Sequence, residues 1–334
     1  MKRILLMSTG GTIASSQGQN GLEPQMHSAQ LLGYVTELQK LYSIECRDLL
    51  NLDSSNIQAE EWKLIARAVA EALPRFDGIV ITHGTDTMAY TASMLSFMLS
   101  GLDKPVVLTG SQLPIDALLT DARNNLYTAF SAVDAGIRGV SIAFNRKVIN
   151  GCRAVKVRTM GFEAFESVNA PYLGEIFAGG MRVYQAPRPR PAPAFRLLDG
   201  VCPDVFLLKL IPSTNPRIFE ALTGLGYRGV VLEAFGAGGL HFVRRDLLSQ
   251  LHRLTEQGVS VVACSQCLYE PSDFSIYEVG QKMLAQGVIP GHDMTTEAAV
   301  TKLMWALGQT GDPARVRQLF ATDLAGEVDL SAGH

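Results

Sequence analysis

The chain has 334 residues, of which 47% are hydrophobic and 18% charged, and its formal net charge at pH 7 is -3. This length is typical of two domains rather than one hydrophobic core, and the composition is typical of a globular protein. The charges nearly balance, without the excess of basic residues that is typical of proteins that bind nucleic acids or anionic membranes. We therefore expect neither partner.

The N-terminal segment and the cysteines favour a cytoplasmic protein without a metal or cofactor. No stretch approaches the roughly 20 apolar residues of a membrane span, and the apolar run of residues 4–7 is shorter than the about 7–15 residues of a secretory signal. The five cysteines are odd in number, which does not indicate a disulfide framework. Cys264 and Cys267 form a C-x-x-C without a second pair for zinc, so packing is favoured over metal or redox chemistry.

Apolar runs alternate along the chain with helix-period segments. Residues 62–73 carry apolar side chains at i, i+3, i+4 and i+7, which predicts an amphipathic helix. Helices are also expected near Asn215-Pro216 and Asp312-Pro313, where a capping residue precedes proline. Strands are predicted at residues 3–7, 78–82, 106–109, 140–144, 205–211, 229–234 and 259–264. This alternation indicates an α/β protein with parallel sheets.

A proline-rich segment suggests the domain boundary. Residues 185–195 (QAPRPRPAPAF) contain four prolines, which favour an extended, semi-rigid linker. A ligand for an SH3-type domain is the less favoured interpretation of this segment. We therefore predict an N-terminal domain over residues 1–185, a linker over 186–204 and a C-terminal α/β domain over 205–334.

Polar turns directly follow the predicted strands, where sites form in open parallel sheets. After the first strand, Gly10 and Gly11 permit a sharp turn and present the hydroxyl of Thr12. A simple tight turn explains this segment equally well. Residues 15–21 (SSQGQNG) are either an inert loop or a mobile lid, and the position directly after Thr12 favours the lid.

The pentad His83-Gly84-Thr85-Asp86-Thr87 follows the strand at residues 78–82 and is unusually polar for core packing. Asp86 can hold a substrate ammonium and Thr85 can relay a proton. His83 is a possible base, but a supporting hydrogen-bonding role is favoured for this single histidine.

Three further segments carry candidate site residues. Residues 53–56 (DSSN) precede the amphipathic helix, so they can cap it, grip a small zwitterion, or do both. Ser111 lies in a third polar turn after a strand. Lys156 is either solvated or, if buried beside Thr85 and Asp86, a base in its neutral form.

Together these segments resemble the bacterial-type L-asparaginase family, and more closely its type I cytoplasmic branch. The two family signatures resemble residues 8–14 (STGGTIA) and 81–88 (ITHGTDTM). Residues 51–56 (NLDSSN) resemble the substrate-binding turn, and 151–165 (GCRAVKVRTMGFEAF) resemble the segment with the catalytic lysine. Residues 208–216, 232–239, 265–280 and 291–302 also look similar, so the resemblance runs from near residue 3 to about 328.

The resemblance implies a two-domain fold, with a larger N-terminal flavodoxin-like sheet and a smaller C-terminal α/β domain, in a homodimer or homotetramer. It implies Thr12 as the nucleophile, with Thr85, Asp86 and Lys156 forming a second hydrogen-bonded group. The implied substrate-binding residues are Gly11, Asp53, Ser54, Ser55, Thr85, Asp86 and Ser111, with Asp86 on the α-ammonium and Ser54 near the α-carboxylate. No cofactor is implied.

Two positions depart from the family. A tyrosine on the lid hydrogen bonds the nucleophilic threonine in many members, and Leu22 stands at the matching place here. Leucine cannot assist proton transfer, which puts the lid's catalytic role in doubt, though not its closure. Some cytoplasmic relatives bind effector asparagine through an arginine, whereas the matching residue here is Glu233, which would repel the effector carboxylate.

The predicted reaction is hydrolysis of the L-asparagine side-chain amide through an ester on Thr12, with weaker action on L-glutamine expected. Direct attack by water is the mechanistic alternative. The functional alternatives are an ammonia-supplying amidotransferase subunit and a non-catalytic amino-acid sensor. The set Thr12, Thr85, Asp86 and Lys156 argues against a sensor, which would not need the lysine.

Overall fold

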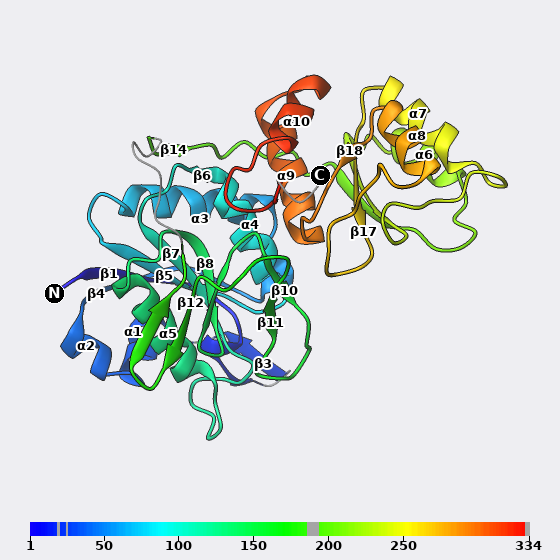
Figure 1. Cartoon of the computed structure of the whole chain (residues 1–334). Coiled ribbons are helices and arrows are strands. Elements are labelled where there is room, and N and C mark those ends of the chain that lie inside the picture. Colours follow the sequence, from blue (N-terminus) through cyan, green and yellow to red (C-terminus); the bar gives the residue numbers. More distant parts are fainter. Residues whose placement is uncertain (19–20, 25, 186–193, 331–334) are drawn as a thin grey trace. The chain divides into compact units, whose positions relative to one another are not determined.

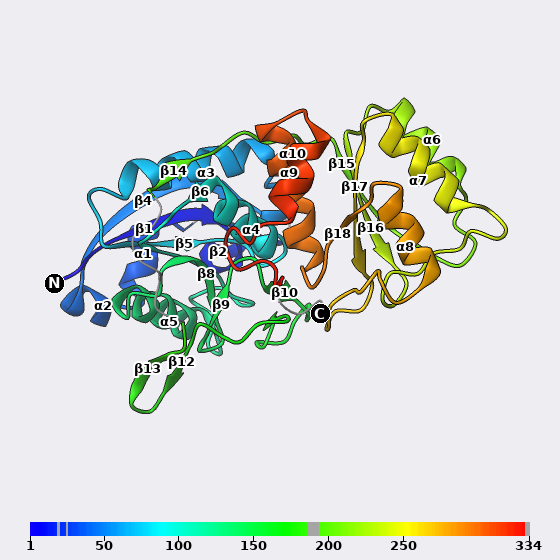
Figure 2. The same ribbon diagram turned by 45° about the horizontal axis from the view of Figure 1, so that its top comes forward.

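The structure is a computed structural model that describes residues 1–18, 21–24, 26–185 and 194–330, without side chains for 16–18 and 21–24. The chain divides into two compact units, Met1–Asp199 and Gly200–His334. Figures 1 and 2 label their helices and strands. None of the helices in the described part of the chain combines the length and apolar character that crossing a membrane requires.

The first unit is built on an eight-stranded sheet. Its strands are β1 (Arg3–Gly10), β4 (Ser43–Leu52), β5 (Gly78–Thr82), β7 (Pro105–Thr109), β8 (Gly139–Phe144), β9 (Lys147–Asn150), β12 (Gly174–Phe177) and β13 (Gly180–Val183). Their order is β13-β12-β9-β8-β7-β5-β1-β4. From β4 to β8 the pairings are parallel, whereas β9, β12 and β13 continue the sheet in antiparallel pairs.

Helices cover both faces of this sheet. Each residue of β5 and β7 is buried, as expected for parallel strands that are covered on two sides. On one face, Val80 and Val107 pack into a core with Phe130 of α5. Figure 1 shows α1 and α5 on this face and α3 and α4 on the other. The helices are α1 (Ser28–Gly33), α2 (Glu37–Leu41), α3 (Ala59–Ala72), α4 (Met88–Met98) and α5 (Ala122–Asp134).

Short elements at the edges of the first unit complete it. Two antiparallel hairpins matter for the site: β2 (Ser15–Gly18) with β3 (Gly21–Pro24), and β10 (Ala154–Lys156) with β11 (Phe165–Ser167). Single turns of 3₁₀ helix follow two strands, η1 (Thr12–Ala14) after β1 and η2 (Ser54–Asn56) after β4. The predicted lid therefore contains a β-hairpin, while the side chain of Leu22 lies outside the described residues.

The second unit has a parallel sheet in the order β15-β16-β17-β18. The strands are β15 (Val205–Lys209), β16 (Gly229–Ala234), β17 (Ser260–Ser265) and β18 (Ile289–Pro290). The helices are α6 (Arg217–Gly224), α7 (Leu247–Glu256), α8 (Glu278–Ala285), α9 (Thr296–Gln309) and α10 (Pro313–Phe320). Figure 2 shows this sheet between α9 on one side and α6, α7 and α8 on the other.

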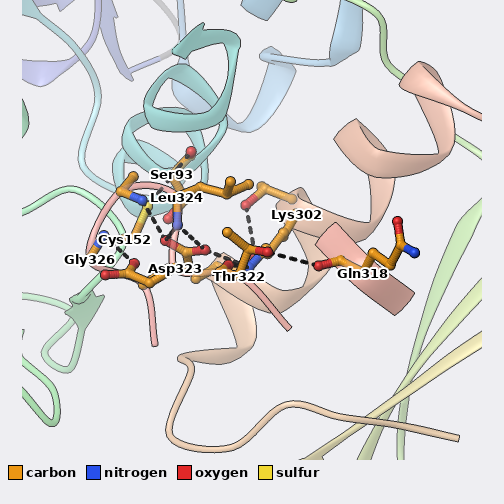
Figure 3. Close-up of polar contacts among 12 residues, drawn as sticks. Ser93, Cys152, Lys302, Gln318, Thr322, Asp323, Leu324 and Gly326 are labelled. Atoms are coloured by element: carbon orange, nitrogen blue, oxygen red, sulfur yellow. Dashed lines mark hydrogen bonds and ion pairs between the residues drawn. The ribbon is translucent and has the colours of Figure 1, made fainter. Parts of the chain in front are cut away.

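A buried ion pair fastens the C-terminal segment of the second unit to α9. Lys302 Nζ lies 2.5 Å from Glu327 Oε1, and neither side chain is exposed to solvent. Lys302 also donates to the carbonyl of Thr322, and Glu327 accepts from the backbone N–H groups of Leu324 and Ala325. Figure 3 shows Lys302 reaching the turn that carries Thr322 and Leu324. Both charges are thus paired and hydrogen bonded, as burial requires.

All seven predicted strands and the amphipathic helix are confirmed, with shifts of a few residues at their ends. The expected α10 begins at Pro313, and the Asp312 carboxylate accepts from Ala314 N–H. The expected α6 begins one residue later than its proline, at Arg217, with Pro216 in the capping position. The two-domain α/β architecture follows the prediction.

The predicted linker over residues 186–204 is described only in part. Residues 186–193 lie outside the described residues. Beyond them, β14 (Arg196–Leu197) pairs with β6 (Leu99–Ser100) of the first unit. The boundary between the two compact units follows Asp199.

Candidate active site

The candidate site residues lie at one edge of the first unit's sheet. β4, β1, β5 and β7 are parallel neighbours, so their carboxyl ends meet at the same edge. The turn with Thr12 follows β1, η2 follows β4, and the His83–Thr87 and Gly110–Leu113 turns follow β5 and β7. The topology therefore brings together four polar segments that the sequence keeps apart.

Glycines allow these turns to touch through their backbones. Gly11 has φ +82°, and a Cβ there would lie 2.4 Å from the backbone nitrogen of Gly84. A Cβ on Gly84 would in turn lie 2.6 Å from Ser54 Oγ. These separations are far below van der Waals contact, so only glycine fits. The Thr12 turn is consequently packed on the His83–Thr87 turn, which is packed on η2.

Thr12 is partly buried at the start of η1. The backbone on either side is fixed, because Gly11 N–H donates to Leu52 O at 3.0 Å and Ser15 Oγ donates to Gly11 O at 3.0 Å. Because the Gly11 N–H already donates to Leu52 O, it is not available to a substrate. Gly11 can therefore contribute to the site only by letting the backbone come close to a ligand. Thr12 is thus presented from a rigid turn.

Lys156, Thr85 and Asp86 form the hydrogen-bonded group that the resemblance implied. Lys156, the last residue of β10, donates from Nζ to Thr85 Oγ1 at 2.8 Å and to Asp86 Oδ1 at 2.6 Å. The Lys156 side chain is 16% exposed, whereas that of Asp86 is 66% exposed. The lysine is therefore largely withdrawn from solvent, while the carboxylate remains open to a ligand.

His83 is buried behind this group and both ring nitrogens are engaged. Trp62 Nε1 donates to Thr91 Oγ1 at 2.9 Å, so the Thr91 hydrogen is free to be donated to His83 Nε2 at 3.0 Å. His83 Nδ1 then donates to Gly84 O at 2.7 Å. Burial lowers the pKa of His83 to about 4, so the ring is neutral at pH 7. This geometry supports the hydrogen-bonding interpretation of His83 rather than the base.

The turn at residues 53–56 caps η2 and not the amphipathic helix. Asp53 accepts from the hydroxyl and the N–H of Ser55, at 2.5 and 2.8 Å, and these bonds lower the pKa of its carboxyl. Helix α3 has its own capping box, made by Gln58 and Glu61. The capping hypothesis for α3 was therefore wrong, because two more residues separate η2 from the helix.

Ser54 and Ser111 are both buried. The carbonyl of Ser54 accepts from Thr87 Oγ1 at 2.7 Å, which binds η2 to the turn after β5. The Ser111 hydroxyl donates to the carbonyl of Leu113 within its own turn. Its oxygen can still accept a hydrogen bond, but its hydrogen is committed to the backbone.

Two polar residues of the site were not assigned by sequence reasoning. Gln112 contacts Thr85 through its side-chain oxygen, and Asp121 accepts from the N–H groups of Gln112 and Leu113. Gln112 stands in a polar turn that was already singled out, which is the signal that could have found it. Asp121 offers no such signal, because it stands where a helix cap is expected. Within the described residues, no cluster of three or more His, Cys, Asp or Glu side chains could hold a metal.

Comparison with known proteins agrees with this architecture. Residues 3–189 match the family model "Asparaginase, N-terminal", and residues 204–320 match "Glutaminase/Asparaginase C-terminal domain". The L-asparaginase of Thermococcus kodakarensis is 42% identical over 98% of this chain and 99% of its own length. A glutamyl-tRNA(Gln) amidotransferase subunit of Methanopyrus kandleri is 35% identical over 98% of this chain and 75% of its own length.

Solved structures of such proteins share the whole fold. The thermostable L-asparaginase from Thermococcus kodakarensis superposes with a TM-score of 0.92 at 41% identity, covering 98% of this chain and all of that one. L-asparaginase I from Vibrio cholerae gives 0.88 at 32% identity, covering 98% and 99%. Fold and comparisons together define a two-domain amidohydrolase. The chain belongs to the asparaginase family.

Proposed function

We propose that the protein hydrolyses the side-chain amide of L-asparagine to L-aspartate and ammonia, with Thr12 as the nucleophile. The observation that carries the proposal is the contact of Lys156 Nζ with Thr85 Oγ1 and Asp86 Oδ1, on a turn against which the Thr12 turn is packed. The 42% identity to a Thermococcus L-asparaginase along almost the entire chain supports the same substrate.

The proposed substrate pocket follows from exposure and charge. Asp86 is the open carboxylate beside Lys156, and we assign it to the substrate α-ammonium. Asp53 with Ser54 and Ser55 forms the other wall, where Ser54 is assigned to the α-carboxylate. Ser111 and the backbone at Gly11 and Thr85 are assigned to the amide end of the substrate.

In the first step, Thr12 Oγ1 attacks the amide carbon, and its proton passes through Thr85 or a water to Lys156 in its neutral form. Gly11 N–H is occupied by Leu52 O, so we assign the Thr12 N–H as the donor that stabilises the oxyanion. The C–N bond then breaks and the nitrogen takes a proton and leaves as ammonia. A β-aspartyl ester remains on Thr12. Water cleaves this ester to aspartate and returns the proton to Thr12.

The experiment that tests this function is ammonia release from L-asparagine by the wild type, Thr12→Ala and Lys156→Met. Thr36→Ala, on the exposed start of α2, is the matched control. We expect release by the wild type and the control, and a loss of at least about 100-fold in the other two variants, since general acid–base catalysis contributes about 100- to 10,000-fold. Retained activity in Thr12→Ala would refute the nucleophile, and mass spectrometry after acid quench distinguishes an aspartyl ester on Thr12 from direct attack by water.

L-Glutamine is proposed as a weaker substrate, because the one methylene by which it differs from L-asparagine changes binding in a pocket by only about 1–3 kcal/mol.

A second candidate function is ammonia supply in an amidotransferase, favoured by the 35% identity to the Methanopyrus amidotransferase subunit. Free L-asparagine turnover by the isolated protein distinguishes these functions. A non-catalytic sensor would bind asparagine or aspartate without releasing ammonia.

We also propose that the protein is a cytoplasmic homodimer or homotetramer. A probable cytoplasmic L-asparaginase from Campylobacter jejuni shares the fold, with a TM-score of 0.81 at 29% identity, covering 97% of this chain and 100% of that one. The homo-oligomeric state is proposed from the family resemblance described above, which implies a homodimer or homotetramer. Cell fractionation and light scattering on the purified protein test the two statements separately.

A further inference from the structure

We propose that Gln112 is a positioning residue that orients the hydroxyl of Thr85 and holds the hairpin that carries Lys156. The inference rests on the proposed function, in which Thr85 and Lys156 move the proton of Thr12. Gln112 acts through these two residues and is not assigned to the substrate.

The side-chain amide of Gln112 can adopt only one orientation. Its Nε2 donates to two carbonyls, Thr159 O at 3.1 Å and Gly161 O at 3.1 Å. A flipped amide would place oxygen against both carbonyl oxygens, which is repulsive. The Oε1 atom must therefore face away from them, toward Thr85 Oγ1 at 3.4 Å.

This orientation determines where the Thr85 hydrogen points. A lysine ammonium has only donors, so Thr85 Oγ1 accepts from Lys156 at 2.8 Å and its own hydrogen goes to Gln112 Oε1. Once Lys156 is neutral, the same hydrogen can turn to Nζ and the Thr85 oxygen can take a proton from the nucleophile. The separation of 3.4 Å is at the weak end of hydrogen bonding, so Gln112 aligns the hydroxyl without trapping it.

The Nε2 end of the Gln112 side chain supports the hairpin that carries Lys156. Thr159 and Gly161 belong to the turn between β10 and β11, and Lys156 ends β10. The two bonds from Gln112 thus brace the far end of the hairpin on which the lysine stands. Val157 N–H to Ala164 O, at 2.8 Å, closes the same hairpin.

Gln112 is itself held by the beginning of α5. The Asp121 carboxylate accepts from Gln112 N–H at 3.0 and 3.1 Å, and from Asn125 Nδ2 at 3.0 Å. Asp121 is the N-cap residue of α5 and Asn125 lies in its first turn. Because α5 packs on the sheet, its N-terminal end holds Gln112 in a fixed position. Helix α5 is connected in this way to Thr85 and Lys156.

The test compares Gln112→Met and Gln112→Glu with the wild type, and Gln39→Met on exposed α2 is the control. Methionine keeps the size but loses both kinds of hydrogen bond. We expect kcat to fall about 10- to 100-fold with little change in KM, since small misplacements of reacting groups cost about this much. Glutamate keeps an acceptor for Thr85 and adds a negative charge near Lys156, but it replaces the donor to Thr159 O and Gly161 O by an oxygen and therefore also loses the brace of the hairpin. Its kcat–pH profile should therefore shift its ascending limb to higher pH, whereas the Met profile should not.

Hydrogen exchange provides a readout that does not depend on activity. In Gln112→Met, amides of residues 157–164 should exchange faster than in the wild type, while those of α5 should not change. Wild-type kcat in Gln112→Met, or unchanged exchange in the hairpin, would overturn the proposal. If the wild type releases no ammonia from either amide, the proposed function fails. Exchange then still tests the bracing of the hairpin, so the two failures are distinguishable.

Discussion

Replacing Gly11 with alanine tests whether packing of the Thr12 turn on the His83–Thr87 turn determines both stability and activity. A Cβ on residue 11 would lie 2.4 Å from Gly84 N, 2.5 Å from Gly84 Cα and 2.8 Å from the carbonyl carbon of His83. All three atoms belong to the backbone, so no side chain can rotate to relieve the contact. One of the two turns must move.

The cost has two parts that can be separated by experiment. The backbone of Gly11 (φ 82°, ψ 174°) lies in a region that essentially only glycine enters, so a residue with a Cβ there costs about 1–3 kcal/mol. Overpacking typically costs about another 1–3 kcal/mol. Gly136 has φ +71°, and the position that its Cβ would occupy has no neighbouring atom within 4 Å, so Gly136→Ala should show only the first part. Gly33, with an open Cβ position and no positive φ, should show neither.

Urea unfolding of the three alanine variants, followed by kcat measurement on the folded protein, provides the assay. Gly11→Ala should lose about 2–6 kcal/mol and, where it still folds, about 100-fold in kcat, because the turn that carries Thr12 is displaced from the turn that carries Thr85. The reasoning is refuted if Gly11→Ala is no less stable than Gly136→Ala, or if it is fully active.

Two further predictions concern buried ionisable groups. Lys302→Met leaves the fully buried Glu327 without its partner and should cost about 3–5 kcal/mol in urea unfolding; the double variant with Glu327→Leu should recover much of this loss, and no recovery would contradict the ion-pair argument. His83 has a folded pKa of about 4, below its ordinary 6.5, because it is buried. Its neutral form therefore contributes stability that is complete above pH 6.5 and is lost as pH falls toward 4, by about 3 kcal/mol. His83→Gln should flatten the stability–pH curve in this window, and an unchanged slope would show that other groups cause it.

The strands could be predicted because buried parallel strands are short apolar runs bounded by polar turns. The same logic located the Thr12, His83–Thr87 and Ser111 turns, since each follows such a run directly. Lys156 could not be found in this way. Its partners Thr85 and Asp86 lie 71 and 70 residues earlier in the sequence, and nothing local distinguishes it from a solvated lysine. The residues alone left Lys156 open as either a solvated lysine or a base beside Thr85 and Asp86, and the resemblance to a family decided between the two.

The contacts that sequence reasoning missed are side-chain bonds to distant backbone atoms. Gln112 reaches carbonyls 47 and 49 residues later in the chain, and a local pattern contains no information about such pairs. Asp121 directly precedes α5, where a capping residue is typical, yet its carboxylate accepts from the backbone N–H groups of residues 112 and 113. Asp53, in contrast, bonds to Ser55 two residues later, so a capping role could be predicted from the local sequence. The element that it caps is η2 rather than the predicted helix.

The glycines of the polar turns are required for the same reason: a side chain at any of them would clash with the neighbouring turn. Gly11 touches Gly84, Gly84 touches Ser54, and a Cβ on Gly110 would lie 2.3 Å from His83 O. In each case the missing Cβ lets one turn approach the next, so these glycines build a close-packed stack of turns rather than flexible loops. Each hydroxyl of the site then stands on a backbone that its neighbours hold in place. Such rigidity is what positioning a nucleophile and its proton relay requires.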